Sequence, residues 1–200
     1  MIPKIIHYCW FGDLPIKNEF AEYIAEWEQL NPDFEIKKWH NNNIPSSIPY
    51  LDVAIKQKNW ANASNYIRLY ALRTEGGIYM DTDMKTLYSL NSLLDYRCFL
   101  GFESGSIEGE NYWVNNAIMG SMPDHEFVRE CESTLLERFD GTEKANLSAP
   151  QLITNILKKK YKLKKYGEQL LSDIMIFEKD VFYPLPYEKT YDKLNFKKYI

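Results

Sequence analysis

Two aspartates, Asp81 and Asp83, follow directly after the short apolar run at residues 78–80 of this 200-residue chain. The run is typical of a β-strand, and residues two apart on a strand share a face, so both carboxylates should project from its carboxyl end. Mg²⁺ and Mn²⁺ prefer such oxygen ligands, take one or two protein carboxylates, and fill their remaining positions with water and substrate phosphates. Aspartates at this spacing also occur by chance in solvated turns, so the metal-site interpretation depends on their surroundings.

A helix should precede this strand. Small or apolar residues recur at helical spacing through Ala63, Ile67 and Ala71, and Gly76 stands where a left-handed residue would end the helix. The pattern predicts a helix packed on a sheet, with a ligand site at the strand end beyond it. Arg68 lies on this helix, and a buried arginine needs a partner, so we expect it either in an ion pair or in contact with a ligand.

The remaining pattern alternates between strands and helices, which favours a nucleotide-binding α/β sheet. We expect strands at residues 4–10, 34–39, 78–80 and 98–102, a helix from Pro15 to the stop at Asn31-Pro32, and helices at residues 51–58, 61–75, 126–139 and 149–161. Residues 101–109 should form a loop. His7 should be a hydrogen-bonded core residue, and the inward side chains of helix 126–139 should be Phe127, Cys131, Leu135 and Leu136.

The stretch ASNYIRLYALRTEGGIYMDTD at residues 63–83, together with IPKIIHYCWFG at 2–12 and NPDFEIKKW at 31–39, resembles the DxD-containing, sugar-binding glycosyltransferases. That family takes in the initiation-type α-1,6-mannosyltransferases, bacterial capsular polysaccharide transferases and, more distantly, the large clostridial glucosylating toxins. The resemblance covers roughly residues 2–130. It implies a GT-A fold, a Rossmann-type nucleotide-binding domain with a mixed, mostly parallel sheet.

The resemblance also implies roles for individual residues. Asp83 would bind Mn²⁺ or Mg²⁺ directly, and Asp81 would bind the metal or the ribose and sugar of a nucleotide sugar donor. Trp10 occupies the family's WxG position and would stack on the nucleobase, although it could instead cap the core. Tyr79 is expected to be packing rather than chemistry.

Four further residues are candidates for contacts with bound sugars. Arg68 and Ser64 match the family's helix motif, while a structural ion pair for Arg68 and close packing for Ser64 are the alternatives. Asn115 and Asn116 lie where relatives place polar contacts to bound sugars, with a turn as the alternative.

Two departures from the family pattern stand out. The usual S-D-x-x-R is here Ser64-Asn65-Tyr66-Ile67-Arg68, so an acid that accepts hydrogen bonds from sugar hydroxyls is replaced by an amide without charge assistance. We expect donor choice or turnover to differ, and Asn65→Asp to raise activity with the family's usual donors. The family's C-terminal histidine and tryptophan segment is also missing before Ile200, which suggests a single domain over residues 1–200 that lacks a short terminal segment.

These implications add up to a metal-dependent glycosyltransferase that moves a sugar to a glycan or lipid-linked glycan acceptor, in bacterial surface polysaccharide synthesis. The resemblance implies retention of anomeric configuration, and because no nucleophile is visible we expect front-face attack by the acceptor. Two alternatives stay open. One is a non-catalytic, transferase-like module that binds nucleotide sugars; the other is a DxD phosphatase, which would need Thr or Val where this chain has Lys85.

Composition predicts one hydrophobic core of ordinary size and a reducing compartment. Hydrophobic residues make up 45% of the chain and aromatic residues 15%, which is ample for one core. The three cysteines Cys9, Cys98 and Cys131 show no metal-binding or disulfide spacing. Without a visible signal peptide or membrane-length apolar run, a cytoplasmic location is expected.

Charge is distributed unevenly along the chain. The net charge is −4, yet residues 151–200 hold eleven lysines and six acids, net +5, so residues 1–150 carry −9. Six of the lysines lie within residues 158–165. They could form a solvated helix end, or they could contact anionic lipid at the inner membrane face. Nucleic acid is not an expected partner, because the cluster lacks arginine and interleaved aromatic residues.

Overall fold

The computed structural model describes residues 1–104 and 112–184, and these residues form one seven-stranded sheet with the strand order β2-β1-β3-β5-β4-β7-β6. The strands are β1 (Ile5–Cys9), β2 (Glu35–Trp39), β3 (Gly77–Met80), β4 (Cys98–Ser104), β5 (Trp113–Ser121), β6 (Gln169–Leu171) and β7 (Ile174–Phe177). Strands β5 and β6 run opposite to the other five. The predicted α/β class with a mixed, mostly parallel sheet is therefore confirmed.

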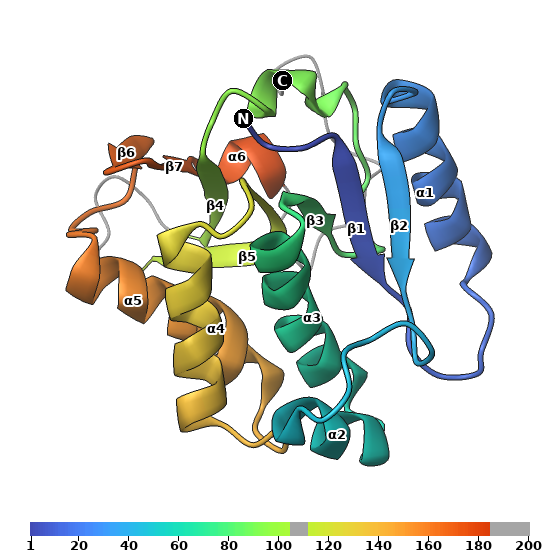
Figure 1. The fold of residues 1–200 in the computed structure, drawn as a ribbon. Helices are drawn as coiled ribbons and strands as arrows, with labels where there is room; N and C mark the ends of the chain where they lie inside the picture. Colours follow the sequence, from blue (N-terminus) through green and yellow to red (C-terminus); the bar gives the residue numbers. More distant parts are fainter. Residues whose placement is uncertain (105–111, 185–200) are drawn as a thin grey trace.

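Helices cover both faces of this sheet (Figure 1). They are α1 (Asn18–Leu30), α2 (Pro49–Lys56), α3 (Trp60–Thr74), α4 (Glu126–Arg138), α5 (Leu152–Lys160) and α6 (Lys179–Phe182), with a 3₁₀ turn η1 (Leu90–Leu93) and a π-helical turn η2 (Leu147–Gln151). Helices α3, α4 and α5 pack on one face, and α1, η1 and α6 pack on the other. No helix in the described ranges is long and apolar enough to span a bilayer.

Alternation along the strands explains this three-layer arrangement. On β3, Ile78 points to the cluster under α1, whereas Tyr79 points to the cluster under α3. The same alternation separates Phe99 from Leu100 on β4. Because side chains on a strand alternate between faces, a strand that is apolar at every position must be covered on both sides.

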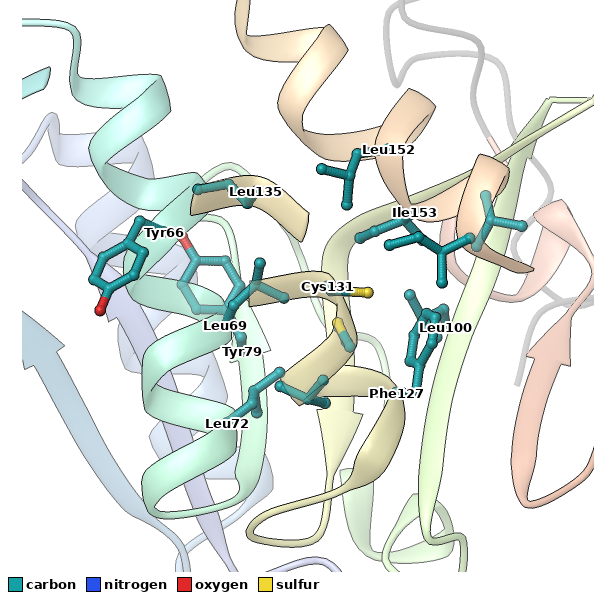
Figure 2. Close-up of a cluster of buried hydrophobic side chains, with 14 of the residues drawn as sticks. Tyr66, Leu69, Leu72, Tyr79, Leu100, Phe127, Cys131, Leu135, Leu152 and Ile153 are labelled. Carbon is teal, nitrogen blue, oxygen red and sulfur yellow. The ribbon is translucent and has the colours of Figure 1, made fainter. Parts of the chain in front are cut away.

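Helix α3 contributes more residues to the larger core than any other described helix, and Figure 2 labels Tyr66, Leu69 and Leu72 on it. Nine of its residues are buried, including three polar ones, because the sheet, α2 and α4 surround it. It ends as predicted, with Gly76 at φ +68°. A Cβ at Gly76 would lie 2.6 Å from the ring of Pro123, so the position needs glycine for space as well as for backbone conformation.

His7 is a hydrogen-bonded core residue, as predicted. It is fully buried on β1, where its Nε2 lies 2.7 Å from the carbonyl oxygen of Gly76 and its Nδ1 accepts a hydrogen bond of 3.1 Å from the indole of Trp39. A carbonyl can only accept, so Nε2 carries the proton in a neutral ring. Burial lowers the pKa of His7.

Several sequence expectations about element boundaries were wrong. The predicted helix at 149–161 begins as the π-helical turn η2, because Pro150 lies inside it and cannot donate to an α-helical ladder. Strand β4 continues to Ser104 where a loop was expected, while residues 105–109 of that loop lie outside the described residues. Leu136 is 40% exposed instead of facing inward. Strands β5, β6 and β7 were not predicted.

Candidate active site

A cavity of about 1290 Å³ opens at the carboxyl ends of β1 and β3. Two parallel strands ending side by side leave such a crevice, and α/β sheets bind their ligands there. Every residue that the sequence suggested for catalysis, donor binding or metal binding lines this cavity, namely Trp10, Ser64, Asn65, Arg68, Asp81, Asp83, Asn115 and Asn116. The structure thus brings together residues from four separate segments of the chain.

The two aspartates occupy different positions from those predicted. Strand β3 ends at Met80, and Asp83 lies in a tight turn closed by a 3.0 Å hydrogen bond from the Met84 nitrogen to the Asp81 carbonyl oxygen. The expectation that both carboxylates share a strand face is therefore wrong, because the chain turns immediately after the strand. The turn still directs both side chains to the cavity.

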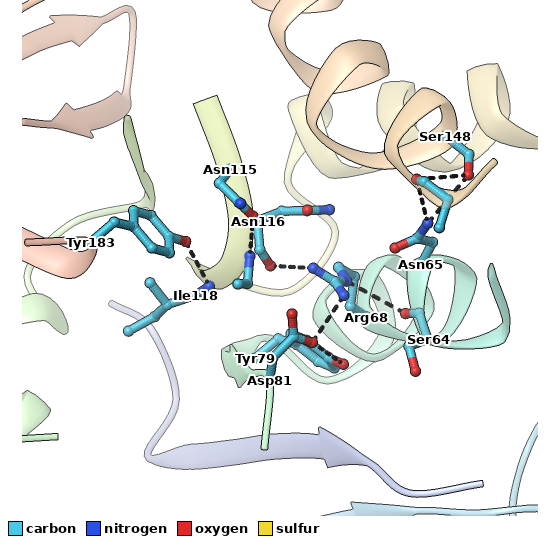
Figure 3. A network of polar contacts seen from close by, with 12 residues as sticks. Ser64, Asn65, Arg68, Tyr79, Asp81, Asn115, Asn116, Ile118, Ser148 and Tyr183 are labelled. Atoms are coloured by element: carbon cyan, nitrogen blue, oxygen red, sulfur yellow. Dashed lines mark hydrogen bonds and ion pairs between the residues drawn. The ribbon is translucent and has the colours of Figure 1, made fainter. Parts of the chain in front are cut away.

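One oxygen of Asp81 is held by two donors (Figure 3). Its Oδ1 accepts hydrogen bonds of 3.0 Å from Arg68 Nη2 and 3.0 Å from the Tyr79 hydroxyl. Burial raises the pKa of the Asp81 carboxyl, and the Arg68 guanidinium opposes that shift. Tyr79 is buried as predicted, but it also orients this carboxylate.

Arg68 is held by three protein partners. Its side chain is 5% exposed and donates to Asp81, to the Asn116 carbonyl oxygen and, at 3.5 Å, to the Ser64 carbonyl oxygen. Its guanidinium carbon also lies 4.5 Å from the centroid of the Tyr79 ring. The structural ion pair considered from the sequence is present, and it fixes the orientation of Asp81.

An irregularity in β5 carries Asn116 to the cavity. The register of the β4–β5 ladder shifts between Phe99 and Gly101, so a longer stretch of β5 faces a shorter one of β4. The Ile118 nitrogen is satisfied instead by the hydroxyl of Tyr183 at 3.0 Å. Bulges of this kind re-aim side chains beside active sites. Asn116 therefore lies on a strand, and the alternative of a turn asparagine was wrong.

Aromatic residues form another part of the cavity wall. Trp10 is half-buried there and donates its indole hydrogen to the Leu14 carbonyl oxygen at 2.8 Å. Trp60 was missed by the sequence reasoning and stacks on Phe11, with ring centroids 6.3 Å apart. Gly12 lies against it, where a Cβ would be 3.3 Å from the Trp60 ring. The predicted stacking of a base on Trp10 remains a prediction.

The donor set fits a divalent cation that also binds substrate. The described residues contain no cluster of three or more His, Cys, Asp or Glu side chains suited to a metal ion. Within those same residues, Asp83 makes no hydrogen bond or ion pair and Asp81 uses only Oδ1, so three carboxylate oxygens stay available. Two carboxylates completed by water and phosphate oxygens are the environment that Mg²⁺ and Mn²⁺ take in nucleotide sites.

Comparison with known families agrees with this site. Residues 17–100 match the model of the glycosyltransferase sugar-binding region containing the DXD motif, and residues 120–196 match the α-1,4-glycosyltransferase conserved region. The chain is therefore similar to two glycosyltransferase families, each over less than half of its length. The first match contains Ser64, Arg68, Asp81 and Asp83, while the finer placement among mannosyltransferases or clostridial toxins is not confirmed.

Individual relatives are similar over most of the chain. The uncharacterized glycosyltransferase L373 of Acanthamoeba polyphaga mimivirus is 29% identical over 161 residues, which is 72% of this chain and 62% of the relative. Human α-1,4-N-acetylglucosaminyltransferase is 26% identical over 94% of this chain and 51% of its own length. Human lactosylceramide 4-α-galactosyltransferase is 28% identical over 92% of this chain and 43% of its own length. The chain thus spans about half the length of these curated relatives.

A solved structure shows the same fold. The PaToxG glycosyltransferase superposes with a TM-score of 0.68 over 80% of this chain and 70% of that one, at 18% identity. The implied GT-A-like architecture is confirmed by this match. At such low sequence identity the likeness concerns the fold alone.

Proposed function

We propose that this protein is a metal-dependent retaining glycosyltransferase that uses a nucleotide diphosphate sugar as donor. The observation that carries the proposal is the arrangement of Asp81 and Asp83 at the cavity. One carboxylate is oriented by Arg68 and Tyr79 with an oxygen to spare, and the other is exposed with no partner among the described residues. Both lie within the segment that matches the DXD sugar-binding region.

Donor binding is divided among the cavity residues. Trp10 offers a ring for the nucleobase, while Asp81 and Asp83 would hold Mn²⁺ or Mg²⁺. Ser64, Asn65 and Asn116 line the part of the cavity around Asp81, where their polar groups are available to sugar hydroxyls. The chemistry that the cation supplies when bound is neutralisation of charge on the diphosphate leaving group.

Transfer proceeds by attack of an acceptor hydroxyl on the same face of the sugar that the phosphate leaves. The bond between the anomeric carbon and the phosphate oxygen breaks as the bond to the acceptor oxygen forms, and the departing phosphate oxygen takes the acceptor proton. The protein contributes by holding the reactants in this geometry. Arg68 supports that geometry by fixing Asp81, which makes it a positioning residue in this scheme.

The acceptor is a glycan or a lipid-linked glycan. The setting we propose is bacterial surface polysaccharide synthesis, in the cytoplasm or at the inner membrane face. Two relatives are named as galactosyl- and N-acetylglucosaminyltransferases, and one of them acts on lactosylceramide. These names suggest UDP-galactose, UDP-N-acetylglucosamine and lactose as the first compounds to test.

A thermal-shift panel tests the proposal. UDP-glucose, UDP-galactose, UDP-N-acetylglucosamine and GDP-mannose are each added with Mn²⁺ or with EDTA. A donor present at about 100 times its Kd stabilises the protein by about 2.7 kcal/mol, which corresponds to a rise in Tm of roughly 5–11 °C. We expect such a rise with at least one donor and only with Mn²⁺. Phosphomonoesters serve as comparison ligands, and a rise in Tm with them alone would favour the phosphatase alternative. That alternative already lacks support, because Lys85 forms an ion pair with Glu26 and does not line the cavity.

A further inference from the structure

Three asparagines spaced by three residues, Asn59, Asn62 and Asn65, lie on one side of α3 and its N-cap. Their amide nitrogens all donate to the irregular segment 141–148 that precedes and enters η2. Asn59 donates to the Gly141 carbonyl oxygen at 3.2 Å, and Asn62 donates to those of Gly141 and Glu143 at 3.0 and 2.9 Å. Asn65 donates to the Ala145 carbonyl oxygen at 3.0 Å and to the Ser148 hydroxyl at 3.2 Å, as Figure 3 shows.

The segment depends on these donors. Gly141 and Glu143 lie in bends outside the described helices and strands, and Ala145 begins the helical stretch that leads into η2. Buried carbonyl oxygens need hydrogen-bond donors, and the asparagine amides supply them. Asn62 and Asn65 are 0% and 4% exposed, so water does not replace them.

The segment forms part of the cavity wall. Its end and η2 contribute Ala145, Asn146, Ala149, Pro150 and Gln151 to the cavity lining. Asn65 lines the cavity as well, next to Arg68 on the same helix, whereas Asn62 does not. The asparagines therefore connect the helix that carries the donor-site residues to a wall that comes from a segment 80 residues later.

We propose that Asn62 and Asn65 are positioning residues that hold residues 141–148 as a fixed wall beside the reaction centre and keep water out of it. This rests on the proposed function for the identity of the reaction, but the wall itself does not depend on it. The Asn65 amide holds the wall by donating a hydrogen bond, since the Ala145 carbonyl oxygen can accept but cannot donate. That requirement explains why an amide stands where the resembling family has an acid.

Asn65→Asp should weaken the wall, contrary to the gain in activity expected from the sequence. A carboxylate at position 65 has no hydrogen to give to the Ala145 carbonyl oxygen and repels it, so the wall loses one of its attachments. We now expect Asn65→Asp to lower the efficiency of transfer with any donor. A rise in transfer would show that acceptance from the sugar matters more than donation to the wall.

Hydrogen exchange measured by mass spectrometry on the ligand-free protein tests the wall directly. The variants are Asn62→Ala and Asn65→Asp, with Asn155→Asp as the control, because Asn155 is exposed on α5 outside the cavity. We expect peptides covering residues 141–151 to exchange at least tenfold faster in both variants, with β1 and β3 unchanged and the control like the wild type. Wild-type exchange of 141–151 in Asn62→Ala would overturn the proposal. If Asn62→Ala does not fold, Ser148→Ala removes the hydroxyl that accepts from Asn65 and Tyr50, and it must show the same local effect.

A second measurement asks whether the wall excludes water. In Asn62→Ala we expect UDP affinity with Mn²⁺ to stay within twofold of wild type, because no cavity-lining atom changes. With the donor found active, we expect the release of sugar to water to rise at least threefold relative to transfer. An unchanged ratio of sugar release to transfer, together with faster hydrogen exchange of residues 141–151, would refute the shielding role. If the wild type cleaves no donor, the proposed function fails, and hydrogen exchange still decides whether the asparagines hold the wall.

Discussion

Asp81 and Asp83 should respond differently to the same substitution, although both are expected to bind the metal. Asp81 forms an ion pair with the buried Arg68, while Asp83 is exposed and makes no hydrogen bond or ion pair with the described residues. Asp81→Asn leaves the guanidinium of Arg68 buried without a countercharge. Asp83→Asn only neutralises an exposed carboxylate. The first change should therefore cost stability as well as ligand affinity, and the second should cost affinity alone.

The size of the difference follows from exposure. Breaking a fully buried ion pair costs about 3–5 kcal/mol. The Arg68 side chain is 5% exposed but that of Asp81 is 33% exposed, and asparagine keeps an acceptor oxygen, so we expect about 2–3 kcal/mol. For a chain of this length this lowers Tm by roughly 4–12 °C. An exposed substitution changes stability by about 0.5 kcal/mol or less, so Asp83→Asn should leave Tm within about 2 °C.

Differential scanning fluorimetry without ligand measures the first effect, and titration with UDP and Mn²⁺ measures the second. Each variant should lose about 2–3 kcal/mol of Mn²⁺-dependent affinity, roughly thirty- to a hundredfold. Equal Tm values for the two variants would refute the structural role of the Arg68–Asp81 pair. Wild-type affinity in Asp83→Asn would refute the metal assignment.

Three other predictions concern the base platform, pH dependence and membrane contact. Trp10→Ala should weaken nucleotide binding by about 1–3 kcal/mol and reduce quenching of tryptophan fluorescence by the nucleotide, whereas a lower Tm with unchanged affinity would make Trp10 a core residue. Burial lowers the pKa of His7, so below pH 6.5 the unfolded chain binds a proton that the folded protein does not bind. The free energy of unfolding should keep its full value above pH 6.5 and fall below that pH. In urea titrations His7→Gln should reduce this pH dependence, and an unchanged pH dependence would contradict the assignment. Replacing Lys162 and the lysines at 158–160 with glutamate should abolish low-salt co-sedimentation with anionic vesicles while nucleotide binding persists; equal binding to neutral and anionic vesicles, or none, would leave a solvated surface.

The part of the site that could be predicted lies in one continuous stretch of chain. Residues 63–83 form a helix, a glycine stop and a strand, so local pattern was enough to place Arg68 near Asp81. Even there the turn at Asp83 escaped prediction, because a strand and a turn can both carry a DxD. The sheet class was predictable because β1, β3 and β4 each form a recognisable apolar run, and because residues 34–39, which contain β2, alternate between apolar and polar side chains.

The rest of the site depends on contacts between distant segments. The Tyr183 hydroxyl accepts a hydrogen bond from the Ile118 nitrogen, 65 positions away in the sequence, and no local pattern predicts that pairing. Strand β5 was missed because its bulge interrupts the two-residue alternation by which strands are recognised. The asparagines of α3 did leave a signal, since polar residues spaced by three in an otherwise buried helix indicate a polar partner, but the sequence does not say that residues 141–148 supply it.

Release of free sugar from a nucleotide sugar is the most direct test of the proposed transferase. The measurement follows each donor of the panel with wild type and with Asp83→Asn, in Mn²⁺ and in EDTA. We predict sugar release from at least one donor by the wild type in Mn²⁺, and none in EDTA or with Asp83→Asn. Tight nucleotide binding without any sugar release, in water and with lactose present, would contradict the account and identify a binding module instead.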